Sequence, residues 1–288
     1  MIRIFGTIFA SLLGLAFGSF LNVCLSRWPE GESIVAPRSH CRNCTQTLSW
    51  WENIPLISWL VLRGRCRNCR TWIGVRYPLV EFAVGALWAT SAWQFFYGIS
   101  ALESPDIFIS VALAAAVEKM ALYWLLVGLA LLDAENLWLP DWITLPGTAL
   151  GFVLTVVSAY FDLGRGATVA AAHSLLGILA AASLILLIRW VYWLIRRREG
   201  IGLGDAKLMA LLAAWLGLPR ALLAFGLGVV LGALVAVVML VIPSSPQDQP
   251  EGWAASKLPL GTFLCVGGIV SGLWGQPIIA AYLRWAGF

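Results

Sequence analysis

The sequence predicts an all-α polytopic membrane protein, a bundle of about seven or eight transmembrane helices with a small cysteine-rich loop domain. Hydrophobic residues make up 60% of the 288 residues and charged residues only 12%, whereas soluble domains average roughly 45–50% apolar and 25% charged residues. The apolar residues also gather in stretches long enough to cross a bilayer, which takes about 17–25 residues in a helix. Two pairs of cysteines stand between the first two of these stretches.

The apolar stretches divide the chain into three parts. A first transmembrane helix at 1–26, which we interpret as an uncleaved span rather than a signal peptide, precedes a loop at 27–76 and a transmembrane bundle at 77–288. A short, glycine-rich stretch near 201–218 either crosses the bilayer or dips into it, because irregular backbone is tolerated at membrane depth where it lines a cavity or protein. The other spans are expected near residues 4–26, 77–98, 107–132, 142–161, 167–195, 220–242 and 262–284.

The basic residues indicate the orientation. The 27–76 loop holds eight arginines, whereas the 99–106 loop holds none. Because short cytoplasmic loops carry an excess of positive charge, we expect the first loop to be cytoplasmic. Counting spans from there places Asp133 and Asp205 at the cytoplasmic face. The net charge of +4 then reflects basic residues that anchor the protein to anionic membrane lipids, and it indicates no nucleic-acid partner.

The 27–76 loop contains two Cys-x-x-Cys pairs, Cys41 with Cys44 and Cys66 with Cys69. Tandem pairs are typical of a zinc site, since each pair supplies half of a tetrahedron and four thiolates leave no position open for substrate. Disulfides and redox-active thiols are the alternatives, and a reducing cytoplasm disfavours disulfides. We therefore predict a structural Zn²⁺ held by all four cysteines, which stabilises a loop too small to fold on a hydrophobic core alone.

Two acidic residues at the ends of apolar runs are the candidate catalytic residues. Asp133 closes the run Trp124–Leu132, and Asp205 follows Gly202 and Gly204 and begins another apolar stretch. A carboxylate beside hydrocarbon is costly unless it is partnered or functional. For Asp205 the structural alternative is a helix N-cap. The two glycines would let a peptide backbone approach closely.

Three residues are candidates for the partner of Asp205, namely Asp133, Glu135 and Asp141. Asp141 follows a proline and precedes a new apolar run, which favours a role as the N-cap of the next helix. Glu135 falls in a polar turn. Asp133 ends the longest uninterrupted apolar run and is expected to be the most desolvated of the three, so we favour Asp133 as the partner. Two nearby carboxylates that share a proton can serve as general acid and general base.

Together these motifs resemble the type IV prepilin peptidases of bacterial pilus and type II secretion systems, relatives of other Gly-x-Gly-Asp intramembrane aspartic proteases. The resemblance covers nearly the whole chain, through Gly18–Val23, Pro37–Cys41, Trp51–Pro55, Arg63–Cys66, Arg76–Glu81, Leu132–Ala134, Leu139–Asp141 and Gly202–Lys207. It implies a multi-pass enzyme of the bacterial inner membrane with a cytoplasmic active site at Asp133 and Asp205. The implied activities are cleavage of the basic leader from prepilins and pseudopilins, and N-methylation of the new amino terminus with S-adenosylmethionine.

The chain departs from the pattern of that family at a few positions. Thr45 and Arg70 stand where glycine or another small residue is usual after the second cysteine of each pair, and Leu260 and Thr262 depart from a usual Pro-Phe-Gly-Pro string. None of these removes a catalytic or metal-binding group. The sequence has no glycine-rich nucleotide loop after a strand, so it assigns no residue to the methyl donor.

Other functions remain as alternatives. A signal-peptide-peptidase-like or presenilin-like protease would not require the four-cysteine loop. A proton-coupled transporter would place its carboxylates near the bilayer midplane rather than at helix ends. A non-enzymatic, zinc-anchored assembly factor leaves the aspartate pair unexplained. Within the peptidase interpretation, Glu135, Asp141 and Glu199 are candidate partners for the basic residues of the leader, with a solvated surface charge as the alternative for each.

Overall fold

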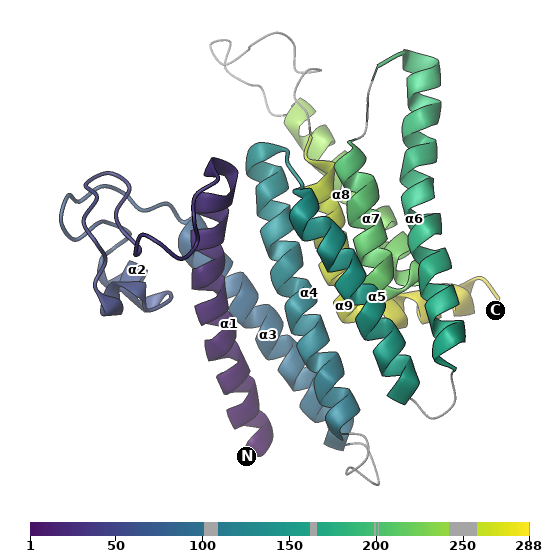
Figure 1. The fold of residues 1–288 in the computed structure, drawn as a ribbon, viewed down its shortest axis with the longest axis horizontal. Coiled ribbons are helices and arrows are strands. Elements are labelled where there is room, and N and C mark those ends of the chain that lie inside the picture. Colours follow the sequence, from purple (N-terminus) through teal and green to yellow (C-terminus); the bar gives the residue numbers. More distant parts are fainter. Residues whose placement is uncertain (101–108, 162–165, 199, 201, 242–257, 288) are drawn as a thin grey trace. The chain divides into compact units, whose positions relative to one another are not determined.

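The computed structural model describes residues 1–100, 109–161, 166–198, 200, 202–241 and 258–287 (Figure 1). In this part of the chain the regular elements are helices, and the cysteine loop adds two isolated β-bridges. The helices are α1 (Ile2–Arg27), η1 (Trp28–Glu30), η2 (Trp50–Asn53), α2 (Ile57–Val61), α3 (Arg76–Ser100), α4 (Ile109–Asn136), α5 (Asp141–Phe161), α6 (Ala167–Arg196), α7 (Leu203–Leu216), α8 (Leu218–Val241) and α9 (Leu260–Trp285).

The helices confirm the predicted fold class. Each predicted apolar stretch is a helix, and six of the described helices, α1, α4, α5, α6, α8 and α9, are long and apolar enough to cross a membrane. The glycine-rich stretch near 201–218 forms α7, which has 14 residues and is shorter than the roughly 20 that a full span requires. Many large apolar side chains of these helices are exposed, as expected for surfaces that face lipid.

The chain forms two compact units, Met1–Gly128 and Leu129–Phe288, whose boundary falls within α4. In the first unit α1 lies along α3, and small residues make the close approach possible. A Cβ added at Gly14 would lie 2.9 Å from the Gly85 Cα, and one added at Gly18 would lie 2.7 Å from the Glu81 Cα. The division at residues 26 and 76 of a helix, a loop domain and a bundle stays a prediction.

In the second unit, α7 is the central helix. It packs against α5, α6, α8 and α9, and ten of its fourteen residues are buried. A helix that is apolar on all sides is expected to be buried in this way. Its last turn is fixed by Trp215, whose Nε1 donates a hydrogen bond of 2.8 Å to the Gly147 carbonyl oxygen in α5. The outer helices therefore enclose α7, which carries Asp205 in its first turn.

Candidate active site and metal centre

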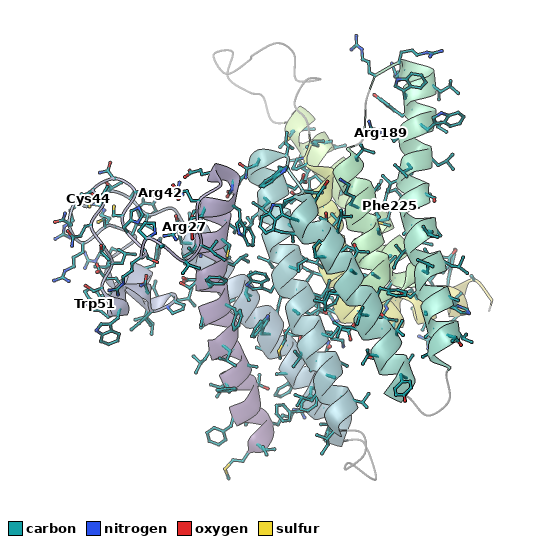
Figure 2. The ribbon with its side chains drawn as sticks, in the orientation of Figure 1. Arg27, Arg42, Cys44, Trp51, Arg189 and Phe225 are labelled. Carbon is teal, nitrogen blue, oxygen red and sulfur yellow. The ribbon has the colours of Figure 1, made fainter. Side chains whose placement is uncertain are left out.

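The four predicted metal ligands come together in the loop domain of the first unit. The Sγ atoms of Cys41 and Cys69 are 3.7 Å apart, those of Cys44 and Cys66 are 3.9 Å apart, and all four lie within 4.8 Å of one another. The labelled Cys44 lies in this loop, beside the end of α1 that carries Arg27 (Figure 2). Each Cys-x-x-Cys pair thus contributes to both short sulfur-sulfur distances.

The two pairs are held by the same backbone turn used twice. The Thr45 amide donates to the Cys41 carbonyl at 2.8 Å, and the Arg70 amide donates to the Cys66 carbonyl at 3.0 Å. Thr45 and Arg70 both have left-handed backbones, with φ of 58° and 59°. This conformation is the physical reason why glycine is favoured there, since other L-residues adopt it at a cost of roughly 1–2 kcal/mol.

The sulfur cluster fits a tetrahedral metal ion. With a zinc-sulfur distance of about 2.3 Å, a regular tetrahedron has edges of about 3.8 Å, which is close to the two short distances above. Hydrogen bonding from Thr71 and from the Asn43 amide lowers the pKa of the Cys69 thiol to about 5, whereas burial raises the pKa of the Cys41 thiol to about 11. The thiolate is the form that binds metals, so Cys69 is the better prepared ligand of the two. The four cysteines could therefore bind a metal ion.

Asp133 lies in the last turn of α4 and is buried, with 6% of its surface exposed. Its Oδ2 accepts hydrogen bonds from the Thr262 backbone N–H at 2.7 Å and from the Thr262 hydroxyl at 3.2 Å. Thr262 is the third residue of α9, so this N–H is one of those that a helix start leaves unpaired. The start of α9 thus binds the Asp133 carboxylate.

Asp205 is the third residue of α7 and is also buried, with 7% of its surface exposed. Its Oδ2 accepts a hydrogen bond of 3.1 Å from the Gly202 N–H. The N-cap alternative considered for Asp205 is therefore wrong, because α7 begins at Leu203 and Gly202 occupies the N-cap position. The apolar run identified the helix, but the helix starts two residues before the acidic residue.

Asp133 and Asp205 both belong to the second unit and lie close enough for their charges to interact. Leu139 lies between the start of α7, which carries Asp205, and the start of α9, which binds Asp133. A Cβ added at Gly204 would lie 3.1 Å from the Leu139 Cβ, and one added at Gly261 would lie 3.0 Å from the Leu139 Cδ1. The lack of a side chain at Gly204 therefore makes room for Leu139, while Gly202 contributes its N–H to Asp205. Their suggested role in admitting a substrate backbone stays a prediction.

The other acidic candidates have different surroundings. Asp141 has an exposed side chain that forms an ion pair with Lys207, and as the first residue of α5 it follows the N-cap position rather than occupying it. Glu135 is exposed in the last turn of α4. Glu199 lies outside the described residues. Among the described candidates, burial therefore distinguishes Asp133 and Asp205 from the rest.

Sequence reasoning missed the contribution of α9. In the sequence, Thr262 is visible only as a departure from the usual Pro-Phe-Gly-Pro string of the family. In the structure it supplies both hydrogen bonds to Asp133 described above. A Cβ added at the neighbouring Gly261 would lie 2.8 Å from the Asp133 Oδ2. The glycine at the start of an apolar helix is the available signal, but the reason for it is its contact with Asp133, which lies far away along the chain.

Comparison with known proteins supports one family over the whole chain. Residues 12–95 match the bacterial peptidase A24 N-terminal domain, and residues 120–237 match the type IV leader peptidase family. Relatives named prepilin leader peptidase/N-methyltransferase are 33% identical in Stutzerimonas stutzeri, over 96% of this chain and 93% of the relative, and 34% identical in Pseudomonas putida, over 97% and 94%. The relative of that name in Burkholderia pseudomallei strain 1026b is 35% identical, over 93% of this chain and 85% of the relative.

No solved structure is a significant match to the chain. The relatives nevertheless cover almost the full length of the sequence, and the two matched domains contain the cysteine cluster and both buried aspartates. The chain therefore belongs to the type IV leader peptidase family.

Proposed function

We propose that this chain is a prepilin leader peptidase and N-methyltransferase, and that Asp133 and Asp205 are its catalytic pair. The observation that supports the proposal is a pair of buried carboxylates in one unit whose charges interact, each bound by an N–H group at a helix start. Positive helix ends favour ionised carboxylates, whereas two close carboxylates oppose ionising together. A shared proton satisfies both tendencies and leaves one acid and one base in the site.

The geometry suggests how the pair would work. The hydrogen bonds to Asp133 and Asp205 fall on Oδ2 in both residues, which leaves Oδ1 for water and substrate. The ionised aspartate takes a proton from the attacking water, while the protonated partner donates to the scissile carbonyl oxygen and then to the leaving amine. A coupled pair titrates as one system, so neither residue is assigned a permanent role.

The substrate class follows from the family and from the orientation of the helices. We infer that prepilins and pseudopilins present a basic leader to a cytoplasmic face of the bacterial inner membrane, where the arginine-rich 27–76 loop anchors to anionic lipid. Glu135 and Asp141, whose side chains are exposed in the second unit, are candidate partners for leader Lys and Arg residues.

The four cysteines would hold Zn²⁺ as a structural ion. Because four thiolates complete a tetrahedron, the ion has no open position and takes no part in cleavage. S-adenosylmethionine would supply the methyl group for the second activity. Loss of zinc should therefore destabilise the loop domain, and the position of leader cleavage should stay the same.

The proposal is tested with detergent-solubilised protein, a prepilin and labelled S-adenosylmethionine, with cleavage and label transfer scored separately. Asp133→Asn and Asp205→Asn should each reduce cleavage to background, because an amide cannot exchange the shared proton. Label transfer to a pre-cleaved pilin should continue in both variants. Cleavage by well-expressed variants of both residues would refute the aspartic mechanism, and wild-type protein that transfers no label would refute the methyltransferase half.

A further inference from the structure

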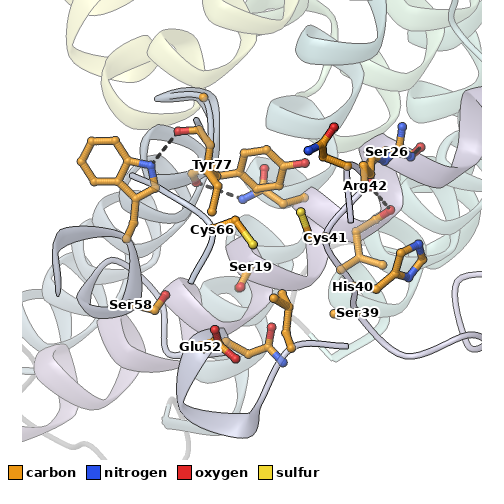
Figure 3. A pocket seen from close by; sticks show the side chains of 18 of the residues that line it. Ser19, Ser26, Ser39, His40, Cys41, Arg42, Glu52, Ser58, Cys66 and Tyr77 are labelled. Atoms are coloured by element: carbon orange, nitrogen blue, oxygen red, sulfur yellow. Dashed lines mark hydrogen bonds between the residues drawn. The ribbon is translucent and has the colours of Figure 1, made fainter. Parts of the chain in front are cut away.

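The short helix α2 of the loop domain has two faces of different character. Ser58 and Trp59 line the cavity that the loop domain forms with α1 and α3, and Figure 3 shows Ser58 on its wall. Ile57, Leu60 and Val61 are instead 58, 66 and 67% exposed. Their spacing of three and four residues places them on one side of the helix. Contiguous exposed apolar side chains mark a surface that contacts a partner or a membrane.

A hydrogen bond at the start of α2 shows its level along the neighbouring helices. The N–H of Leu56, the residue before α2, donates to the Glu81 Oε2 in α3 at 2.7 Å. Glu81 in turn lies beside Gly18 of α1, where an added Cβ would lie 2.7 Å from the Glu81 Cα. The start of α2 is therefore within one glutamate side chain of the level of Gly18.

That level of α1 lies within the bilayer. The 26 residues of α1 have a length of about 39 Å at roughly 1.5 Å per residue, whereas the hydrocarbon core is about 30 Å thick. Gly18 is nine residues from the end of α1 at Arg27, so it would lie about 4 Å inside the core even if all of the excess length projected beyond that end. The start of α2 therefore lies at the boundary between hydrocarbon and headgroups.

α3 carries an exposed apolar surface at the same level. Leu79 and Phe82 are 62 and 61% exposed, and they lie two residues before Glu81 and one residue after it. Exposed apolar side chains at this depth are expected to face lipid, because there is no water in the hydrocarbon to solvate them. The exposed side of α2 is therefore at the same depth as a surface that contacts acyl chains.

The charge of the segment after α2 matches lipid headgroups. Residues 62–75 contain no acidic residue and four exposed arginines, namely Arg63, Arg65, Arg67 and Arg70. An apolar helix face with basic residues beside it is typical of segments that lie in the interface of an anionic membrane. The same charge disfavours two other occupants of the face, the basic leader of a prepilin and an identical arginine-rich surface of a second copy.

We propose that α2 is an interfacial anchor, with the Ile57, Leu60 and Val61 side chains inserted into the leaflet that surrounds the C-terminal half of α1. The arginines that follow α2 contact the headgroups of that leaflet. Cys66 of the sulfur cluster comes five residues after the end of α2, so the anchor holds the cluster close to the membrane surface. This role depends on neither of the proposed enzymatic activities.

The first test uses a genetically encoded fluorescent amino acid at position 60 of the full-length protein, in lipid nanodiscs that hold one copy. The same probe at position 35 is the control, because Val35 is an apolar residue of the loop domain beyond the end of α1 and is 85% exposed. Lipids brominated on their acyl chains quench a probe in hydrocarbon, and iodide quenches a probe in water. Brominated lipid should quench the probe at position 60 strongly and iodide should quench it weakly, with the reverse at position 35.

Three results would overturn the proposal. Quenching of position 60 by iodide alone would show that α2 faces water, and protection from both quenchers would show that another part of the chain covers it. Iodide quenching that is lost only when a prepilin or a second copy is added would assign the face to that partner.

The second test asks if the apolar side drives the insertion. Ile57→Ser combined with Val61→Ser should shift the quenching at position 60 from brominated lipid toward iodide, and Val35→Ser should leave it unchanged. All three changes are at exposed side chains, so the thermal unfolding of the protein should not change. If the double variant is quenched as the unsubstituted helix is, the apolar side does not anchor α2. If the double variant does not fold, the first test decides, because it leaves Ile57 and Val61 in place.

Discussion

Gly261→Ala should impair leader cleavage by displacing a catalytic carboxylate. The added Cβ would lie 2.8 Å from the Asp133 Oδ2 and 2.9 Å from its Cγ, distances at which one of the atoms has to move. On the other side the same Cβ would lie 3.0 Å from the Leu139 Cδ1. The methyl group therefore pushes the carboxylate away from the start of α9.

The size of the effect follows from the bond that this movement breaks. The Thr262 N–H donates to the Asp133 Oδ2 at 2.7 Å, and a hydrogen bond to a charged group contributes about 1.5–3 kcal/mol. If that contribution is lost from the transition state, kcat falls by roughly 10- to 150-fold. Global stability should not account for the loss, because alanine is favoured over glycine within a helix by about 1 kcal/mol.

The assay measures kcat and KM for cleavage of a purified prepilin, with methylation of a pre-cleaved pilin as a second readout that should not change. The matched control is Gly226→Ala in α8, where an added Cβ meets no atom within 4 Å. Cleavage by Gly261→Ala at the wild-type rate would show that Asp133 does not act from the position described.

Three further changes test the same site and the metal centre. Thr262→Val removes the hydroxyl but keeps the N–H to Asp133, so cleavage should fall by less than in Gly261→Ala, about 3- to 10-fold, and Thr262→Ser should restore it. Asp141→Asn breaks an exposed ion pair of the kind that contributes at most about 1 kcal/mol, and it should retain most of the cleavage measured for wild type. Cys66→Ser should reduce bound zinc by metal analysis. Because protons compete with the metal for all four thiolates, zinc should stay bound at neutral pH and be released as the solution is made acidic, which metal analysis after dialysis at each pH would show.

The membrane-spanning helices could be predicted from sequence because the bilayer constrains them locally. A span needs a minimum length of apolar residues, and that requirement is visible in any window of the chain. The predicted stretch at 167–195 and the observed helix Ala167–Arg196 differ by one residue. The four metal ligands could be predicted for a similar reason, since two cysteines three positions apart are placed by local backbone structure to bind one metal ion together.

Helix starts were less accessible to sequence reasoning. Asp205 and Asp141 both precede apolar runs, which favoured them as N-caps, yet they are the third and first residues of their helices. The N-caps are Gly202 and the position before Asp141. A polar side chain in the first turn of a helix can bind the N-cap backbone from inside the helix, as Asp205 does. A residue at the N-cap and a residue in the first turn produce the same sequence pattern, an acidic residue before an apolar run.

The tertiary partner of Asp133 could not be predicted, and it resolves an electrostatic problem in the site. Asp133 lies at the C-terminal end of its own helix, where the helix dipole disfavours a carboxylate. Asp205 has no such problem, since it lies at the start of α7. The start of α9 compensates by presenting the Thr262 N–H to Asp133 from 129 residues along the chain. Each carboxylate therefore has a helix N-terminus, and the pair becomes chemically comparable only when α9 is in place.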